Sequence, residues 1–406
     1  MRNLPSGWQF SKLGEECDLI SGQHINAKDY NVEGKGIGYL TGPADFSHLN
    51  PIVSKWTEHP KRTAIENDIL ITVKGSGVGK VNLMSERELA ISRQLMAVRS
   101  RGVTIGYLYK FLSYHFNYFQ ALGTGAAIPG LSRSDVLGLD IPLPPLPEQK
   151  RIVAILDEAF AGIDKAIANT ERNLENAREL FESYLNQSMS KTSDGWVERL
   201  IGDMVRITHG YAFKGKDFEV SNDSALPIVL TPGNYTEAAT LCFDSKNTKR
   251  LKTLPPEGYE FNVGDLTIVM TDLSSKMKIL GKPAFIESDQ ILHNQRVGRI
   301  IFNEDALNER FLYYYLQTQS VSDNIKGTST GTMVRHTAPK RILSNKISFP
   351  VRPSEQIKIV AKLDSIKEDV QRLEVLASGK ISLLKELKQS ILHKAFSGEL
   401  TSDPIH

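Results

Sequence analysis

Two long stretches of this chain carry apolar side chains at alternating steps of three and four residues, the spacing of a coiled-coil seam. In residues 148–190 the seam positions are Val153, Leu156, Phe160, Ile163, Ile167, Thr170, Leu174, Ala177, Phe181 and Tyr184. In residues 355–406 they are Leu363, Ile366, Val370, Leu373, Ala377, Lys380, Leu384, Leu387 and Ile391. Each pattern predicts a helix of about 40 residues, roughly 60 Å long.

Each predicted helix has an apolar stripe that is too narrow for the helix to be stable alone in water, so it must pack against a partner. The simplest arrangement pairs the two helices with each other as a coiled coil. Because a whole globular segment separates them along the chain, antiparallel pairing is the natural geometry. The alternative is that each helix docks separately on another protein.

The segments that precede the two helices have the irregular pattern of α+β domains. Short apolar runs bounded by Gly, Pro and Asn predict strands at Ile69–Val73, Leu95–Arg99 and Leu266–Met270. Aromatic-rich segments predict one helix at Tyr107–Leu122 and another at Glu309–Gln319. The predicted fold class is therefore α+β, with two globular α/β domains joined by two long antiparallel helices.

The two halves of the chain repeat each other. The sequence GWQFSKLGEECDLISG at Gly7–Gly22 recurs as GWVERLIGDMVRITHG at Gly195–Gly210, and PEQKRIVAILD at Pro147–Asp157 recurs as SEQIKIVAKLD at Ser354–Asp364. A repeat of this length indicates duplication of a whole domain with its helix, and it predicts a pseudo-two-fold relation between the halves. We expect Trp8 and Trp196 to occupy the same core position, and the molecule to offer its partners two similar but non-identical surfaces.

Composition and charge narrow the possibilities only slightly. Charged residues make up 24% of the chain, hydrophobic residues 40%, and the net charge is +2. No apolar run is long enough to span a membrane, so we expect no membrane partner. The N-terminal residues lack the apolar core of a signal peptide, which makes the cytoplasm the expected location. A slight excess of basic side chains in the two globular segments is compatible with DNA binding but would not suggest it.

The sequence contains no recognisable motif for catalysis or metal binding. The nine histidines form no ligand pair at short spacing, and Cys17 and Cys242 stand at non-equivalent positions of the repeat, as free thiols would. The segment KGSGVGKV at Lys74–Val81 resembles a phosphate-binding loop but lacks its first glycine and the hydroxyl residue that binds magnesium. We therefore expect no cofactor and no metal on this chain.

Three matched pairs of polar loops are candidate DNA contacts. The first pair is Lys74–Val81 in one half and Thr271–Lys278 in the other, each directly after an equivalent strand. Glycines would let backbone N–H groups approach phosphates while lysines supply charge, although a flexible turn between strands is the plainer interpretation. The candidate residues of this pair are Lys74, Ser76, Lys80, Thr271, Lys276 and Lys278.

The second pair aligns SRQLMAVR at Ser92–Arg99 with HNQRVGRI at His293–Ile300, which places Gln94 opposite Gln295. The third pair, rich in small residues, is Gly123–Val136 with Gly327–Ile342. Arg, Asn and Gln can make bidentate contacts to guanine and adenine edges, whereas polar residues at the start of a strand are more often only solvated. The two pairs add the candidates Arg93, Gln94, Asn294, Gln295, Arg296, Thr124, Arg133, Thr328, Arg335 and His336.

One continuous stretch and its second copy resemble a known family. GTGAAIPGLSRSDVLGLDIPLPPLPEQKRIVAILDE, at Gly123–Glu158, is similar to the junction between recognition domain and conserved helix in type I restriction–modification specificity subunits. ISFPVRPSEQIKIVAKLD and the terminal HKAFSGELT resemble the distal repeat and tail of that family. The resemblance covers the whole chain and implies target-recognition domains at 1–147 and 191–354, with conserved helices at 148–190 and 355–406.

The resemblance implies a subunit without catalytic activity that gives its partner subunits their DNA sequence specificity. Two adenine methyltransferase subunits would dock along the helices and carry S-adenosylmethionine. Two ATP-dependent translocase and nuclease subunits, with ATP and Mg²⁺, would join for restriction. Each recognition domain would read one half of a split, asymmetric site in double-stranded DNA. The alternatives are a specificity module of a methylation-only or other phage-defence system, and a two-domain enzyme with an unrecognised site.

Overall fold

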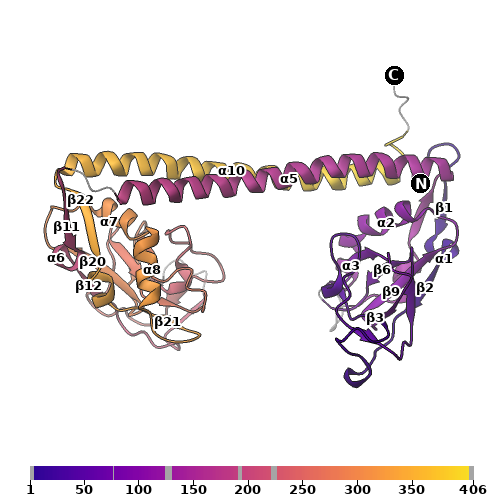
Figure 1. The fold of residues 1–406 in the computed structure, drawn as a ribbon, viewed down its shortest axis with the longest axis horizontal. Coiled ribbons are helices and arrows are strands. Elements are labelled where there is room, and N and C mark those ends of the chain that lie inside the picture. The colour runs from indigo at the N-terminus through magenta and orange to yellow at the C-terminus, as the bar shows by residue number, and fades with distance from the viewer. Residues whose placement is uncertain (1–3, 76, 124–129, 191–193, 221–225, 402–406) are drawn as a thin grey trace. The chain divides into compact units, whose positions relative to one another are not determined.

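The computed structural model describes residues 4–75, 77–123, 130–190, 194–220 and 226–401. The chain forms two compact units, Met1–Glu171 with Ala377–His406, and Arg172–Leu376. Each unit has its own hydrophobic core and contains one globular domain with parts of both long helices (Figure 1). The α+β fold with two long helices is confirmed.

The first globular domain is built on two four-stranded sheets. Its strands are β1 (Gln9–Lys12), β2 (Cys17–Ser21), β3 (Ile37–Leu40), β4 (Trp56–Thr57), β5 (Thr63–Ile65), β6 (Ile69–Thr72), β7 (Val81–Leu83), β8 (Glu88–Ile91), β9 (Leu95–Ser100) and β10 (Asp140–Leu143). Its helices are α1 (Leu13–Glu16), η1 (Ala27–Asp29), η2 (Pro43–Asp45), α2 (Ile105–Tyr114), α3 (Phe116–Gly123) and α4 (Arg133–Leu137). One sheet, β2-β9-β6-β7, is antiparallel throughout, and the other has the order β4-β3-β8-β5.

The second globular domain repeats this plan. Its strands are β11 (Trp196–Leu200), β12 (Val205–His209), β13 (Phe218–Val220), β14 (Ile228–Val229), β15 (Lys249–Leu251), β16 (Leu266–Val269), β17 (Thr271–Asp272), β18 (Pro283–Phe285), β19 (Ile291–Leu292), β20 (Val297–Phe302), β21 (Arg335–His336) and β22 (Lys346–Pro350). Its helices are α6 (Ile201–Met204), η3 (Pro232–Asn234), α7 (Glu309–Tyr315), α8 (Gln319–Gly327) and α9 (Pro339–Leu343). The sheet β12-β20-β16-β18 corresponds strand by strand to β2-β9-β6-β7.

Aligned glycines of the sequence repeat make the same close backbone contact in both domains. A Cβ added to Gly22 would lie 2.1 Å from the carbonyl oxygen of Ser92, and one added to Gly210 would lie 2.2 Å from that of His293. No side chain fits at either position, which explains why both are glycine. The two tryptophans of the repeat also pack into the core of their own unit, as predicted.

The aromatic-rich segment that was expected to form one helix forms two. Helix α2 ends at Tyr114, α3 begins at Phe116, and His115 stands between them. The ring nitrogen Nδ1 of His115 lies 2.9 Å from the carbonyl oxygen of Phe111, so the ring competes for an acceptor that a continuous helix would use. The second domain has a similar break, because α7 ends at Tyr315 and α8 begins four residues later.

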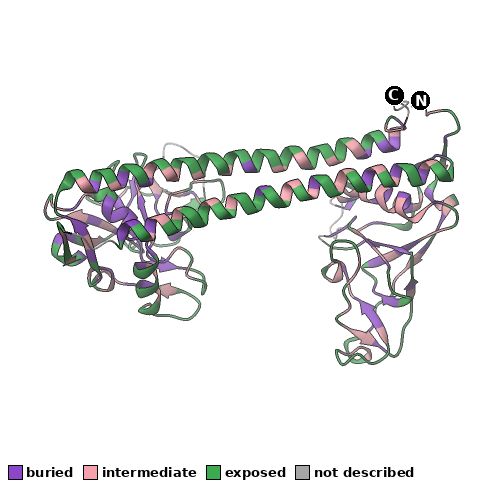
Figure 2. Ribbon diagram, turned by 45° about the horizontal axis from the view of Figure 1, so that its top comes forward, coloured by how far each residue is buried: buried purple, intermediate pink, exposed green. Residues whose placement is uncertain are grey.

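The two long helices are α5 (Leu146–Met189) and α10 (Pro353–Ser397). In the first unit the early part of α5 meets the late part of α10, where Asp164 pairs with Lys388 at 2.5 Å. In the second unit the late part of α5 meets the early part of α10, where Arg178 pairs with Glu374 at 2.6 Å. The helices are therefore antiparallel within each unit, and most of their surface is exposed (Figure 2).

The seam predicted for α5 is confirmed, whereas the seam predicted for α10 is wrong at Leu373, Lys380 and Leu387. Thr170, the polar seam position of α5, is only 8% exposed. In α10, Leu373 and Leu387 are each 47% exposed, and Lys380 is exposed as well. The neighbouring Glu374 and Lys388 are half-buried instead and take part in the two ion pairs between the helices. Ion pairing allows a charged residue to replace a leucine at these seam positions.

None of the helices in the described residues combines the length and the apolarity that crossing a membrane requires. Within the same residues, no group of three or more His, Cys, Asp and Glu side chains is placed to hold a metal ion. Both cysteines are free. Cys17 is buried, and burial raises the pKa of its thiol to about 12, so the thiol is held in its unreactive protonated form.

Candidate nucleic-acid interface

In the first domain, the predicted contact residues gather at one end of the central sheet. Strands β2 and β6 end there, and β9 and β7 begin there, as antiparallel neighbours must. The loop of Lys74 and Lys80 joins β6 to β7, while Arg93 and Gln94 directly precede β9. All four side chains are exposed. Two further candidates, Ser76 and Thr124, lie outside the described residues.

Ser92 builds the turn that presents Arg93 and Gln94. Its hydroxyl donates a hydrogen bond to the carbonyl oxygen of Thr41 at 2.6 Å and accepts one from the backbone N–H of Gln94 at 3.1 Å. Ser92 is only 4% exposed, so it supports the turn and leaves the next two side chains in solvent. Thr41 is fixed in turn by the carboxylate of Asp45, which accepts its backbone N–H at 2.6 Å.

Arg133 reaches the same end of the sheet from helix α4. Its guanidinium donates to the hydroxyl of Ser21, the last residue of β2, at 3.0 Å. The segment leading to α4 is anchored to the sheet, because the backbone N–H of Leu131 donates to the carbonyl oxygen of Val73 at 2.8 Å. Arg133 is exposed. The structure thus brings together three segments that the sequence had suggested separately.

Glycines shape the loop that carries the two lysines. Gly75 and Gly79 have φ angles of 89° and 83°, a region that other residues rarely adopt. Gly79 also leaves no room for a side chain, because an added Cβ would lie 2.7 Å from the Cβ of Phe119. Neither Lys74 nor Lys80 forms an ion pair with any other described residue. Their charge is therefore available for an anionic ligand.

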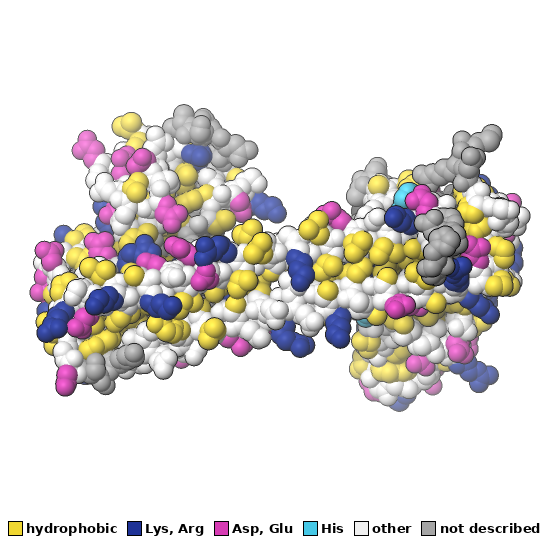
Figure 3. All heavy atoms as spheres, turned by 90° about the horizontal axis from the view of Figure 1, so that it is seen from above, with side chains coloured by type: hydrophobic (Ala, Val, Ile, Leu, Met, Phe, Trp, Pro, Cys, Tyr) yellow, Lys and Arg dark blue, Asp and Glu magenta, His cyan; other side chains and the backbone are white. Residues whose placement is uncertain are grey.

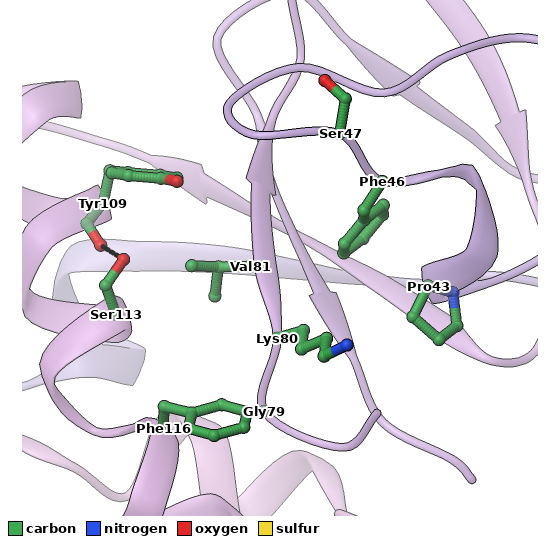
Figure 4. A pocket seen from close by; sticks show the side chains of 9 residues that line it. All are labelled: Pro43, Phe46, Ser47, Gly79, Lys80, Val81, Tyr109, Ser113 and Phe116. Atoms are coloured by element: carbon green, nitrogen blue, oxygen red, sulfur yellow. Dashed lines mark hydrogen bonds between the residues drawn. The ribbon is translucent and has the colours of Figure 1, made fainter. Parts of the chain in front are cut away.

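A pocket of about 310 Å³ opens beside Lys80 (Figure 4). The rings of Phe46, Tyr109 and Phe116 line it, together with the hydroxyl groups of Ser47 and Ser113. In the second domain Tyr313 stands at the position of Tyr109, because each follows the N-cap of its domain helix by five residues. There the hydroxyl of Tyr313, on α7, donates to the carbonyl oxygen of the buried Ala239 at 2.9 Å.

The second domain presents the corresponding edge, but the predicted alignment of its polar residues is wrong by one position. The backbone N–H of Val73 donates to the carbonyl oxygen of Gln94, and the N–H of Met270, after the equivalent strand, donates to that of Arg296. Gln94 is therefore the counterpart of Arg296 and not of Gln295. The alignment failed because it matched identical side chains, whereas the ladder hydrogen bonds determine which positions are equivalent.

Asn294 has the structural task of Ser92, although it stands one residue after His293, whose carbonyl oxygen faces Gly210 as that of Ser92 faces Gly22. The turn of the second domain is therefore one residue longer. Asn294 is 7% exposed, and its side-chain oxygen accepts the backbone N–H of Arg296 at 3.0 Å. Gln295 and Arg296 are both exposed beyond it. Of the three candidates in this turn, one therefore supports the backbone, and two are free to meet a ligand.

The strand pair β17 and β21 places Thr271 opposite His336, and Asp272 opposite Arg335. Thr271 is 4% exposed, and its hydroxyl lies 3.1 Å from Nδ1 of His336. The guanidinium of Arg335 donates to the carbonyl oxygen of Gly331 at 2.6 Å and is half-buried, whereas His336 is exposed. Thr271 thus positions its partner, and His336 is the more accessible of the pair.

The remaining candidates of the second domain differ in whether their side chains already have a partner within the protein. Lys276 is exposed and forms no ion pair within the described residues, whereas Lys278 pairs with Glu237 at 2.6 Å. Both side chains of that pair are more than half exposed, so the ion pair is weak. A phosphate of DNA could therefore replace Glu237 as the partner of Lys278. The hydroxyl of Thr328 donates to the carbonyl oxygen of Asn324 at 2.8 Å and so caps helix α8.

The sequence did not point to Tyr211, which lies beside Gln295 and is 42% exposed. The backbone N–H of Tyr211 donates to the carbonyl oxygen of His293 at 2.7 Å, and its own carbonyl oxygen accepts the N–H of Gln295 at 3.0 Å. Its ring packs against those of Phe213 and Tyr259, at 5.0 Å and 5.4 Å between centroids. Tyr211 and Phe213 come from one loop and Tyr259 from another, so no local pattern in the sequence links all three.

Each unit therefore combines an α+β domain, an edge of exposed basic and amide side chains, and a long helix. Residues 5–175 and 193–391 each match the type I restriction modification DNA specificity domain. This chain belongs to that family and is a specificity subunit of type I restriction–modification systems.

Comparison with individual proteins agrees with this assignment. The MjaVIII specificity subunit of Methanocaldococcus jannaschii is 23% identical over 98% of this chain and 94% of its own length. The putative MjaX specificity subunit of the same organism is 34% identical, but the match covers 37% of this chain and 36% of the relative.

Among solved structures, a chain of the type I R-M system covers 98% of this chain and all of its own, with a TM-score of 0.76 at 20% identity. The HsdS subunit from Thermoanaerobacter tengcongensis covers 98% of both chains, with a TM-score of 0.54 at 19% identity. At this level of identity the likeness concerns the fold.

Proposed function

We propose that each globular domain reads one half of a split, asymmetric site in double-stranded DNA. The observation that carries the proposal is the matched pair of edges: the same turn of the same sheet presents Gln94 in one domain and Arg296 in the other. Glutamine pairs best with adenine and arginine with guanine, so equivalent positions would select different bases. Two similar folds with different edges are what an asymmetric site requires.

The candidate residues divide by the contact that their surroundings permit. Exposed lysines on loops would neutralise phosphates, and exposed amide and guanidinium groups at the start of β9 and β20 would meet base edges. The proposed phosphate contacts are Lys74, Lys80, Lys276 and Lys278. The proposed base contacts are Arg93, Gln94, Gln295 and Arg296, with Arg133, Arg335 and His336 at the margins. Thr271, Asn294 and Thr328 would hold the backbone beneath them.

Catalysis would belong to partner subunits. We propose two adenine methyltransferase subunits, which carry S-adenosylmethionine, and two ATP-dependent translocase and nuclease subunits, which carry ATP and Mg²⁺. The long helices support this arrangement, because α10 exposes leucines that its pairing with α5 does not cover: Leu373, Leu376, Leu383 and Leu387. Figure 3 shows hydrophobic side chains on the outward face of the helices. Such exposed apolar positions favour a protein partner.

The test is a methylation assay with purified components. This chain, the methyltransferase subunit encoded with it, and both together would each receive DNA and labelled S-adenosylmethionine. We expect methyl transfer to adenine only when both proteins are present, and only on DNA that carries the bipartite site. Methyl transfer by this chain alone would contradict the proposal that it has no catalytic activity.

A further inference from the structure

A buried glutamine joins the first long helix to the domain that precedes it. Gln149 stands in the first turn of α5 and is 3% exposed. Its Oε1 accepts the backbone N–H of Thr104 at 2.9 Å and the hydroxyl of the same residue at 3.1 Å. Its Nε2 donates to the carbonyl oxygen of Pro144 at 3.0 Å. Thr104 is the N-cap of α2, and Pro144 directly follows β10.

The second unit has the same device. Gln356 stands in the first turn of α10 and is fully buried. Its Oε1 accepts the backbone N–H of Asn308, the N-cap of α7, at 2.8 Å. Its Nε2 donates to the carbonyl oxygens of Ala306 and Pro350 at 2.8 Å and 2.9 Å. In both units one carboxamide therefore ties together the end of a strand, the start of a domain helix and the start of a long helix.

The other contacts at the first junction include an ion pair between Lys110 of α2 and Asp157 of α5 at 2.7 Å, whose carboxylate is more than half exposed and holds the lysine only weakly, and a set of apolar contacts. Phe396 of α10, for example, meets the rings of Tyr107 and Phe111 of α2 edge-on, at 5.3 Å and 5.4 Å between centroids. Apolar burial favours contact without fixing direction, so such a surface can shift slightly at little cost. Hydrogen bonds depend on distance and angle, and water cannot easily replace them when they are buried. The hydrogen bonds of the glutamine thus restrict the orientation of the globular domain relative to α5.

We infer that Gln149 and Gln356 are positioning residues, each of which fixes the orientation of its recognition domain relative to the long helix that follows. By doing so they narrow the range of spacer lengths between the two half-sites that the chain accepts. The inference rests on the proposed function, because it presumes two half-sites separated by a spacer. Neither glutamine would contact DNA, since both are buried. Gln149 also lies beside Thr104, which follows the end of β9 opposite to the contact edge. The effect of the two glutamines would be on the spacing between half-sites and not on the bases read.

The test substitutes the first glutamine without changing its volume. Gln149→Met removes all three hydrogen bonds, and Thr104→Val removes only the hydroxyl bond, which keeps a measurable variant if the first fails to fold. The matched control is Asn82→Leu. Asn82 is 1% exposed, and its amide donates to the carbonyl oxygen of Ser47 at 3.1 Å, within the domain and away from α5.

Two measurements are made on each variant. The first is the initial methylation rate of the complex on DNAs whose half-sites lie at the native spacing, one base pair closer and one base pair further apart. The second is the hydrogen exchange of the Thr104 amide in the chain without DNA, compared with amides of strand β9. In Gln149→Met we expect the preference for the native spacing to fall roughly tenfold. The bases read should stay the same, and Thr104 should exchange faster while β9 does not.

The smaller change Thr104→Val should have the same effect to a lesser degree, and Asn82→Leu should leave the spacing preference unchanged. An unchanged preference in Gln149→Met, in spite of faster exchange at Thr104, would overturn the inference. A similar loss of preference in Asn82→Leu would overturn it too, because general destabilisation would then suffice. If the unaltered complex methylates no bipartite site, the proposed function fails, whereas unchanged exchange at Thr104 in Gln149→Met refutes the junction contact itself.

Discussion

Single side chains decide what each edge can recognise, because equivalent strands lead into and out of the turn in both domains. Gln94 and Arg296 stand at equivalent positions, and each is presented by a buried polar residue, Ser92 in one domain and Asn294 in the other. The supporting residue can differ between the domains provided that it accepts the same backbone N–H. The exposed residue can then change with the DNA site without disturbing the fold.

A first prediction concerns Gln94. Replacing it with alanine should relax the choice of base at one position of one half-site, with a loss of discrimination of about 1–3 kcal/mol against the wrong base. The measurement is the methylation rate on DNAs that carry each base at each position. The other half-site serves as the internal control, and a change there would show that Gln94 acts through the fold.

A second prediction concerns the lysines of the β6–β7 loop. Lys74→Ala and Lys80→Ala should each weaken binding about equally on all DNA sequences and lower the slope of log affinity against log salt by about one. The control is Lys12→Ala, because Lys12 lies in β1, ahead of the strand β2 that runs toward the contact edge. A change in preferred base with an unaltered slope would mean that the substituted lysine reads bases.

A third prediction concerns His293, which is 3% exposed and whose Nε2 bonds the carbonyl oxygen of Val297. Burial lowers the pKa of His293 to about 4, so the folded state protonates less readily than the unfolded state. Stability should therefore fall as the pH drops from about 6.5 toward 4, with a loss of about 2 kcal/mol at pH 5. His293→Gln should remove most of this loss in denaturant unfolding, whereas His59→Gln, at an exposed site, should keep it.

At the scale of elements, the helical pattern was predictable where apolar residues mark the buried side. The seam of α5 could be followed through Thr170 because the seam positions before and after it, Ile167 and Leu174, are apolar. The seam of α10 contains Glu374 and Lys388, and the sequence offers exposed leucines one position away from each. Periodicity alone assigns the leucines to the seam, because a single sequence does not show which charged residues form ion pairs with the opposite helix.

The contact edge was predictable by residue type but not by arrangement. Repeated loops pointed to lysines, amides and arginines, and several of these meet at one end of a sheet because consecutive strands begin and end there. The sequence could not separate exposed Gln295 and Arg296 from buried Asn294, since their burial depends on hydrogen bonds between distant strands. Nor could it place Tyr211 beside them.

A fourth prediction is that the paired helices set the spacer. Inserting four residues after Thr170 adds about one turn, or about 6 Å, which equals at most about two base pairs of DNA. Because only one helix of the pair grows, we expect the spacer to lengthen by about one or two base pairs while the bases read stay the same. The control is the same insertion at the exposed Gly34, in a loop of the first domain. A folded, active variant with the original spacer would show that partner subunits set the distance.

At the scale of the whole molecule, the duplication gives one chain two recognition domains that can change independently. Each compact unit has its own core, its own contact edge and its own glutamine at the helix junction. A change inside one domain should therefore leave the other domain folded and its half-site unchanged. The long helices and their exposed leucines would stay constant, because partner subunits must dock in the same way whatever DNA is read.

The most direct test exchanges residues 1–147 for the corresponding segment of another specificity subunit of the family. The chimera and the unaltered chain would each be expressed with the methyltransferase subunit, and the methylated adenines of the host genome would be sequenced. We predict that the chimera changes one half-site and keeps both the other half-site and the spacer. A methylome in which both half-sites change together, or in which neither changes, would contradict the division of DNA recognition between the two domains.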